Sequence, residues 1–233
     1  MSRAPWESPG TVTLILHEHA FAAYCWKALI ALYERDVPFE RRHVGDAADR
    51  AALAALWPLA SIPVLVDDAA GVTLPESTVV VEYLDRFGDA PPLISRDDAD
   101  AALQARLWDR VVDGHVATPM QKIVADALRA PGREDPEGVA QARAQLDQAY
   151  PVLETQLGRA GGWLAWPAYT LADVAAAPAL FYARVVHRWD EAAHPALTAY
   201  WTTLSDRPSV ARVIDEARPY RELFPLPWPV HVA

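Results

Sequence analysis

The chain of 233 residues has a single cysteine, Cys25, and an excess of acidic over basic side chains. One cysteine excludes an internal disulfide framework. A formal net charge of −10 argues against nucleic acid or an anionic membrane surface as a partner, because both are bound mainly through Lys and Arg. No apolar run is long enough to cross a bilayer, and residues 1–7 lack the apolar core of a signal peptide. We therefore expect a cytoplasmic protein.

The chain is rich in apolar side chains, and their spacing changes once along it. With 52% hydrophobic residues, the chain can bury a large core. Strands are predicted at residues 11–16, 39–44, 64–66 and 72–74, and helices at 21–33, 47–56 and 76–87. From about residue 99 the pattern is helical, with Gly and Pro at the turns and a capping-box spacing at Thr170 and Asp173. The order β-α-β-α-β-β-α followed by helices predicts an α/β domain and then an all-α domain.

Two short motifs point to a ligand site beside the third strand. Pro63 stands directly before the apolar run 64–66, where its missing N–H costs no ladder bond and a cis peptide is possible. Glu76 and Ser77 then open an amphipathic stretch, and Pro75 before them is a helix-start signal. Because a helix N-terminus offers free amides and the positive end of its dipole, and Ser77 adds a hydroxyl, this pair is a candidate anion site.

These motifs, and others along nearly the whole chain, resemble those of the glutathione transferase superfamily. The other matching segments are Tyr24-Cys25-Trp26-Lys27, Ile30-Ala31-Leu32-Tyr33-Glu34, Trp108-Asp109-Arg110, Pro119-Met120-Gln121-Lys122-Ile123-Val124 and Ala175-Ala176-Ala177-Pro178-Ala179-Leu180-Phe181-Tyr182-Ala183. The resemblance implies a thioredoxin-like α/β N-terminal domain, an all-α helical-bundle C-terminal domain, and a homodimer. We place the first domain at 11–88, a linker at 89–98, the helical domain at 99–218 and a proline-rich tail, without helix, at 219–233.

The resemblance also implies glutathione as co-substrate. By position, the backbone of Ile62, before a cis Pro63, would bind the cysteinyl part of glutathione. Glu76 and Ser77 would hold its γ-glutamyl end. The second partner would be a small apolar electrophile.

Position 22 departs from the family pattern. An active transferase places a Ser, Tyr or Cys near the start of the first helix to stabilise or replace the glutathione thiolate. The match puts the usual serine at Ala22, which is left as a residue of the substrate pocket without a hydroxyl. Tyr24 and Cys25 remain as catalytic candidates. Tyr24 either points into the cleft or packs in the core, whereas the apolar neighbours of Cys25 favour a buried, unreactive thiol.

The helix expected around residues 108–124 would wall the second-substrate pocket, by resemblance to the family. Aromatic and apolar side chains recur along it at three-to-four spacing, which is typical of a core face as well. Trp108 and His115 are the residues we assign to the pocket. Pro119 should kink the helix, because it removes a backbone hydrogen bond.

Two further pairs of side chains could carry chemistry. Asp109 and Asp113, four residues apart, have the spacing of paired carboxylates, but solvated charges on a long helix are the commoner arrangement. His17 and His19 alternate so as to share a strand face, but without further ligands they are a weak metal signal. We expect no metal.

The sequence thus predicts a glutathione transferase-like protein. It would conjugate glutathione to a small apolar electrophile, or use glutathione in thiol-dependent reduction or isomerisation. Because Ala22 replaces the usual serine, two alternatives stay open: a protein that binds glutathione or apolar ligands without turnover, and a structural or interaction module.

Overall fold

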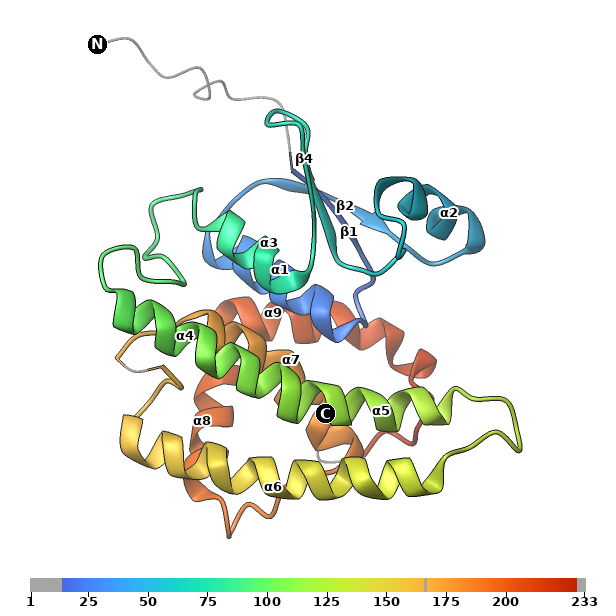
Figure 1. The fold of residues 1–233 in the computed structure, drawn as a ribbon, viewed down its shortest axis with the longest axis vertical. Coiled ribbons are helices and arrows are strands. Elements are labelled where there is room, and N and C mark those ends of the chain that lie inside the picture. Colours follow the sequence, from blue (N-terminus) through green and yellow to red (C-terminus); the bar gives the residue numbers. More distant parts are fainter. Residues whose placement is uncertain (1–13, 166, 230–233) are drawn as a thin grey trace.

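The computed structural model describes residues 14–165 and 167–229, and it has a sheet at one end and a bundle of helices at the other (Figure 1). Strands β1 (Leu14–Glu18), β2 (Phe39–His43), β3 (Val64–Asp67) and β4 (Val72–Pro75) form one sheet in the order β2-β1-β3-β4. β1 pairs parallel with β2 and antiparallel with β3, and β3 pairs antiparallel with β4. The predicted element order is confirmed; residues 11–13 of the predicted first strand lie outside the described residues.

Three helices complete the N-terminal part: α1 (Ala23–Glu34), α2 (Ala47–Leu56) and α3 (Ser77–Leu84). α1 and α3 lie between the sheet and the helical bundle, whereas α2 lies away from the bundle (Figure 1). α1 packs against α3 on one side and against α7 and α9 on the other. Its central turns, from Cys25 to Leu32, are therefore completely buried.

The C-terminal part contains the helices α4 (Ala99–Val112), α5 (Thr118–Ala127), α6 (Pro136–Ala160), α7 (Leu171–Val186), α8 (Pro195–Ser205) and α9 (Pro208–Ala217). α7 is buried along most of its length and is the centre of the bundle. Its predicted capping box is present, because the side chains of Thr170 and Asp173 each accept a bond from the other residue's backbone N–H. No helix in the described part of the chain is long and apolar enough to cross a membrane.

One cluster of buried side chains runs from the sheet into the helical bundle. It includes Leu16 of β1, Trp26 of α1, Val80 of α3, Val112 of α4 and Leu180 of α7. The two parts are therefore joined by a continuous apolar core, which fixes the position of α1 and α3 relative to α4.

The long helix predicted across residues 108–124 changes its winding before Pro119 rather than at it. Residues Asp113–Ala117 form a π-helical turn, η1, in which the N–H of Thr118 donates to the carbonyl of Asp113. The hydroxyl of Thr118 donates to the same carbonyl at 2.8 Å. Pro119 then lies in the first turn of α5, where its missing N–H costs little. π-helical turns are frequent at functional sites, and this one faces a cavity described below.

The proline-rich tail begins with a helix, contrary to the prediction. Residues Arg218–Leu223 form a 3-10 helix, η2, which Pro219 can start because the first turn needs no N–H from it. Beyond η2 the described residues wrap over the start of α1, since the rings of Phe224 and Trp228 lie 5.8 and 6.0 Å from that of Phe21. Wrapping was one of the two alternatives that the sequence left for this segment.

Candidate functional site

The first helix begins with two backbone amides that have no hydrogen-bond partner among the described residues. Ala22 is the N-cap of α1 and its methyl group cannot accept a bond, so the N–H groups of Ala23 and Tyr24 stay free. The turn before them is held by the N–H of Phe21, which donates to Nδ1 of His19 at 3.1 Å. The dipole of α1 puts partial positive charge at this end, which favours a negatively charged ligand atom there.

These amides border a cavity of about 710 Å³, which we name the apolar cavity. Its walls come from the start of α1, from α5 and from the tail: Phe21, Met120, Val124, Leu128, Leu223 and Phe224. No acidic side chain is among the described residues that line it, and Arg50 is its one fixed positive charge. A cavity of this size and composition fits a small apolar molecule.

A second cavity of about 580 Å³ lies between α3 and the junction of α4 with η1; we name it the polar cavity. Polar and charged side chains supply much of its wall: Glu76, Ser77, Thr78, Arg110, Asp113 and Thr118. Tyr24, Ser61 and Ile62 line both cavities, so the two are adjacent. Together they can hold an elongated ligand with one polar and one apolar end.

The sequence motifs beside the third strand meet at the polar cavity. The Ile62–Pro63 peptide bond is cis, as expected, and both residues line the wall. Glu76 is the N-cap of α3 with φ +70°, a left-handed conformation that costs a non-glycine residue about 1–3 kcal/mol and recurs at ligand sites. Ser77, the first residue of α3, is 7% exposed. The arrangement brings a helix N-terminus and a hydroxyl to the same wall.

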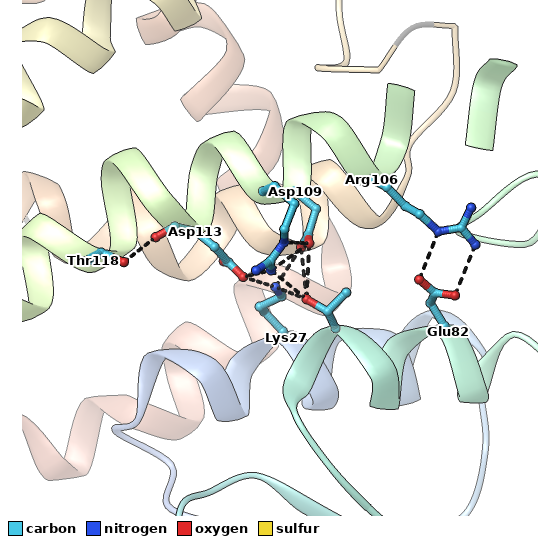
Figure 2. A network of polar contacts seen from close by, with 8 residues as sticks. Lys27, Glu82, Arg106, Asp109, Asp113 and Thr118 are labelled. Atoms are coloured by element: carbon cyan, nitrogen blue, oxygen red, sulfur yellow. Dashed lines mark hydrogen bonds and ion pairs between the residues drawn. The ribbon is translucent and has the colours of Figure 1, made fainter. Parts of the chain in front are cut away.

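A network of buried ion pairs lies behind the polar cavity, and we call it the floor of this cavity (Figure 2). Nζ of Lys27, which is 1% exposed, donates to Asp109 at 2.7 Å, to Asp113 at 2.9 Å and to the hydroxyl of Thr78 at 2.9 Å. Asp109 and Asp113 are 1% and 7% exposed. The expectation that these two carboxylates are solvated charges on a helix surface is therefore wrong. Both point toward Lys27 of α1, which is their buried counterion.

Arg110 joins this network from the solvent side. Its Nε and Nη2 donate to one oxygen of Asp109, and its Nη2 also contacts Asp113. Burial alone would lower the pKa of Arg110, but hydrogen bonds to the two carboxylates and their negative charges raise it above the ordinary value. The guanidinium therefore stays charged at the edge of the cavity.

Tyr24 stands where the two cavities meet. Its ring is half-buried, and burial, together with the negative charge of Asp113, raises the pKa of its phenol. A hydrogen bond with the side chain of Thr118 opposes this shift. Tyr24 is thus protonated at neutral pH and keeps an O–H that can donate a hydrogen bond. Of the alternatives that the sequence left for this ring, the structure adopts the orientation toward the cleft.

Cys25 follows Tyr24 in α1 but lies in the core. The side chain is fully buried, and this burial raises the pKa of the thiol well above its ordinary value. It is absent from the described residues that line either cavity. A catalytic role for Cys25 therefore has no geometric support, in agreement with the expectation that the thiol is buried.

Trp108 and His115, assigned to the pocket from the sequence, are not among the described residues lining either cavity. Trp108 is partly buried against the common core, and His115 is exposed on η1. The residues of this long helical segment that line the apolar cavity lie further along, at Met120 and Val124. The π-helical turn rotates the residues after it relative to an uninterrupted α-helix, so the spacing of Trp108 and His115 does not continue to Met120 and Val124.

His17 and His19 do not share a strand face, contrary to the expectation. His17 lies in β1, whereas His19 follows its end, and the ring of His19 lies 4.7 Å from that of His43 and 5.6 Å from that of Tyr220. Burial and the nearby charge of His43 lower the pKa of His19 below its ordinary value. Among residues 14–165 and 167–229, no three His, Cys, Asp or Glu side chains gather as a metal site would require.

Two family models match the chain. The model of the glutathione S-transferase N-terminal domain matches residues 16–92, and that of the glutathione S-transferase C-terminal domain matches residues 116–208. The glutathione S-transferase GstB of Escherichia coli K12 is 25% identical over 195 residues, which cover 81% of this chain and 91% of that protein.

Solved structures share the fold. A glutathione S-transferase from Methylobacillus flagellatus with glutathione bound has a TM-score of 0.77 at 24% identity and covers 86% of this chain and 98% of that one. A glutathione transferase family member from Pseudomonas fluorescens Pf-5, also with bound glutathione, has a TM-score of 0.72 at 27% identity, with the same coverage. The likeness extends over both parts of the molecule.

Proposed function

The chain belongs to the glutathione S-transferase superfamily, and we propose that it binds glutathione across both cavities and conjugates it to a small apolar electrophile. The observation that carries this proposal is the continuity of the two cavities at Tyr24, Ser61 and Ile62. Glutathione has a charged γ-glutamyl end, a thiol in the middle and a glycyl carboxylate. The polar cavity would hold the charged γ-glutamyl end, and the adjoining apolar cavity would hold the electrophile close to the thiol.

In the proposed complex, the γ-glutamyl end lies in the polar cavity against Glu76 and Ser77. The backbone of Ile62, before the cis peptide, binds the cysteinyl part. The glycyl carboxylate reaches toward Arg50, which is exposed on α2 and lines the apolar cavity. This orientation brings the thiol to the start of α1.

The chemistry at the sulfur follows from the groups found there. A thiol must lose its proton to attack, and the free amides of Ala23 and Tyr24 stabilise the thiolate that remains. The protonated phenol of Tyr24 can donate a further hydrogen bond. The thiolate then forms a bond to an electrophilic carbon, the bond to the leaving group breaks with its electron pair, and the thiol proton goes to solvent. The electrophile occupies the apolar cavity.

Calorimetry with Ser77→Ala tests the binding site. We expect wild type to bind glutathione and Ser77→Ala to bind it about 1.5–3 kcal/mol more weakly, the amount typical of a lost hydrogen bond to a charged group. Ser205→Ala, at the end of α8, is the matched control and should bind as wild type does. Absence of glutathione binding to wild type, or equal binding by the two variants, would contradict the proposal.

A second candidate, a protein that binds glutathione without turnover, is favoured by one observation: the residue at the start of α1 is Ala22, which has no hydroxyl. Intact glutathione binding, with no conjugation of varied aromatic electrophiles, would select this candidate. Measurable conjugation would exclude it.

The proposed homodimer has a candidate surface on α3 and α4. Val79, Leu103 and Leu107 are 47%, 61% and 46% exposed, and a bidentate bond from Arg106 to Glu82 links the two helices between them. A second copy of the chain could cover this face. Light scattering of wild type and of Leu103→Glu would measure the assembly: a dimeric mass that the charge reduces supports the surface, and a monomeric wild type contradicts it.

A further inference from the structure

Arg110 is the one basic side chain among the described residues that line the polar cavity. It lies in the last turn of α4, just before η1, and its side chain is 61% exposed. Most surface arginines are free to move, so exposure by itself does not make a binding group. What distinguishes Arg110 is how its guanidinium is held.

The guanidinium is fixed along one edge only. Nε and Nη2 donate to Oδ2 of Asp109 at 3.0 and 2.9 Å, and Nη2 also donates to the hydroxyl of Thr78 at 3.1 Å and contacts Asp113. Nη1 has no partner in the part of the chain that the structure describes. A planar group held in this way is oriented before a ligand arrives, and it keeps N–H donors for that ligand.

The charge of Arg110 is available because Lys27 neutralises part of the negative charge beneath it. Asp109 and Asp113 carry two negative charges, and Lys27 and Arg110 carry two positive ones, so the network is neutral as a whole. Without the buried lysine, the same floor would carry a net negative charge and would repel an anion. Lys27 therefore acts as an internal counterion that keeps the outer guanidinium attractive to a carboxylate.

The rest of the polar cavity defines which anion fits. Ser77 and the start of α3 add hydrogen-bond donors, whereas Glu76 and Asp113 add negative charge on the same wall. One oxygen of Asp113, Oδ1, is buried without a hydrogen-bond partner among the described residues. A multiply charged anion such as phosphate would meet these carboxylates unfavourably. A group that joins one carboxylate to one ammonium, as in a free α-amino acid head, matches both signs.

We propose that Arg110 is the specificity-determining residue of the polar cavity, and that it binds the free α-carboxylate at the γ-glutamyl end of the ligand. The inference rests on the proposed binding of glutathione. It goes beyond that proposal because it assigns the binding of this carboxylate to a residue of the helical domain. Arg and carboxylate form parallel N–H···O bonds, which a Lys cannot reproduce. The ligand's head would then be held between α3 of one domain and α4 of the other.

A chemical double-mutant cycle tests this assignment. The two ligands are glutathione and 4-aminobutanoyl-cysteinylglycine, which lacks only the α-carboxylate, and binding is measured by calorimetry. We expect wild type to lose about 10- to 100-fold in affinity when the carboxylate is absent. Arg110→Gln should lose at least about 3-fold less than wild type, because the guanidinium no longer binds the carboxylate while Ser77 still does. Arg110→Lys, which keeps the charge but not the planar fork, should fall between the two.

Arg106→Gln is the matched control. Arg106 is exposed on the same helix one turn earlier and is also bound to a residue of α3, Glu82 (Figure 2). It is not among the described residues that line the polar cavity. This variant should discriminate between the two ligands as wild type does, at the same molecular mass in solution. If wild type binds both ligands equally, or if Arg110→Gln discriminates fully, the assignment of Arg110 is wrong. If wild type binds neither ligand, the proposed function fails and takes this inference with it.

Discussion

The two adjacent cavities share three lining residues, yet they are built in opposite ways. The polar cavity is backed by a network in which Lys27 and Arg110 balance Asp109 and Asp113, with each carboxylate bonded to both cations. The apolar cavity has aromatic and aliphatic walls, and its donors near the start of α1 are backbone amides and the phenol of Tyr24.

The difference shows that this network of buried charges lies beside the polar cavity and not beside the apolar one. Buried charges are costly, so a network of four is maintained only where its geometry is closely defined, here across the boundary of two domains. At the start of α1 the chain has no comparable group, because Ala22 supplies only a methyl. In the proposed function, charged side chains therefore bind the polar end of the ligand, whereas the thiolate is stabilised only by neutral donors.

Removing the cation beneath the polar cavity should have the largest effect. Lys27→Met keeps the length of the side chain but leaves two buried carboxylates with Arg110 as their remaining cation. Breaking a buried ion pair from one side typically costs about 3–5 kcal/mol, since the other charge is left uncompensated. We expect a loss of that size in the free energy of unfolding, measured by urea denaturation.

The control for this loss is another lysine that pairs with an aspartate at the surface. Lys122 contacts Asp135, and both side chains are more than a third exposed. Lys122→Met should leave the unfolding midpoint close to that of wild type, because exposed pairs contribute little. Equal losses in the two lysine variants would show that the floor of the polar cavity is no more sensitive than the surface.

A hydroxyl added at the start of α1, beside the apolar cavity, should reduce the difference between the two cavities in side-chain donors. We expect Ala22→Ser to raise the rate of conjugation of an aromatic electrophile by about 10- to 100-fold, because one donor aimed at a developing charge commonly contributes that much or more. Glutathione affinity should change little, since the new bond strengthens only as the thiolate forms. Steady-state kinetics and calorimetry on the same preparations separate the two effects.

Tyr24→Phe removes the remaining side-chain donor and is the companion variant. If the phenol assists the thiolate, its loss should slow conjugation while glutathione still binds. A fast wild type that Ala22→Ser leaves unchanged and Tyr24→Phe abolishes would assign the catalytic role to Tyr24 alone. A fast wild type that neither variant alters would leave the amides of α1 as the groups that stabilise the thiolate.

The sequence predicted local features well and contacts between distant elements poorly. The order of strands and helices and the capping box at Thr170 depend on neighbouring residues, and both are confirmed. Asp109 was taken for a solvated charge because its partner, Lys27, lies 82 residues away on a helix that reads as uniformly apolar. A lysine in such a helix is the signal that could have found the network, since a buried ammonium requires nearby carboxylates.

The wall of the apolar cavity was missed for a related reason. An α-helical wheel carries Trp108 and His115 onto one face, but the π-helical turn between Asp113 and Ala117 breaks that periodicity. No propensity in the sequence marks the extra residue in the turn. The tail was likewise undetermined, because packing of Phe224 on Phe21 is a tertiary contact that only the folded start of α1 provides.

The smallest expected effect concerns His19, the histidine among the described residues that line the apolar cavity. Nδ1 of His19 accepts the N–H of Phe21, so protonation of that nitrogen breaks the bond that holds the turn before α1. Burial first, and then the charge of His43, lowers the pKa of His19, while Glu18 opposes and Arg50 adds to the shift. Because the folded state binds this proton less readily than the unfolded state, the stability that neutral His19 contributes is present above the unfolded pKa of about 6.5 and is lost as pH falls below it.

We expect urea denaturation to show that the free energy of unfolding falls by about 1 kcal/mol or less between pH 7.5 and pH 5, and that this loss is smaller in His19→Gln. His115→Gln, at an exposed position on η1, should keep the wild-type pH dependence. Parallel curves for wild type and His19→Gln would mean that the turn before α1 does not depend on the neutral imidazole, and the contrast between the two cavities would then rest on the buried charges alone.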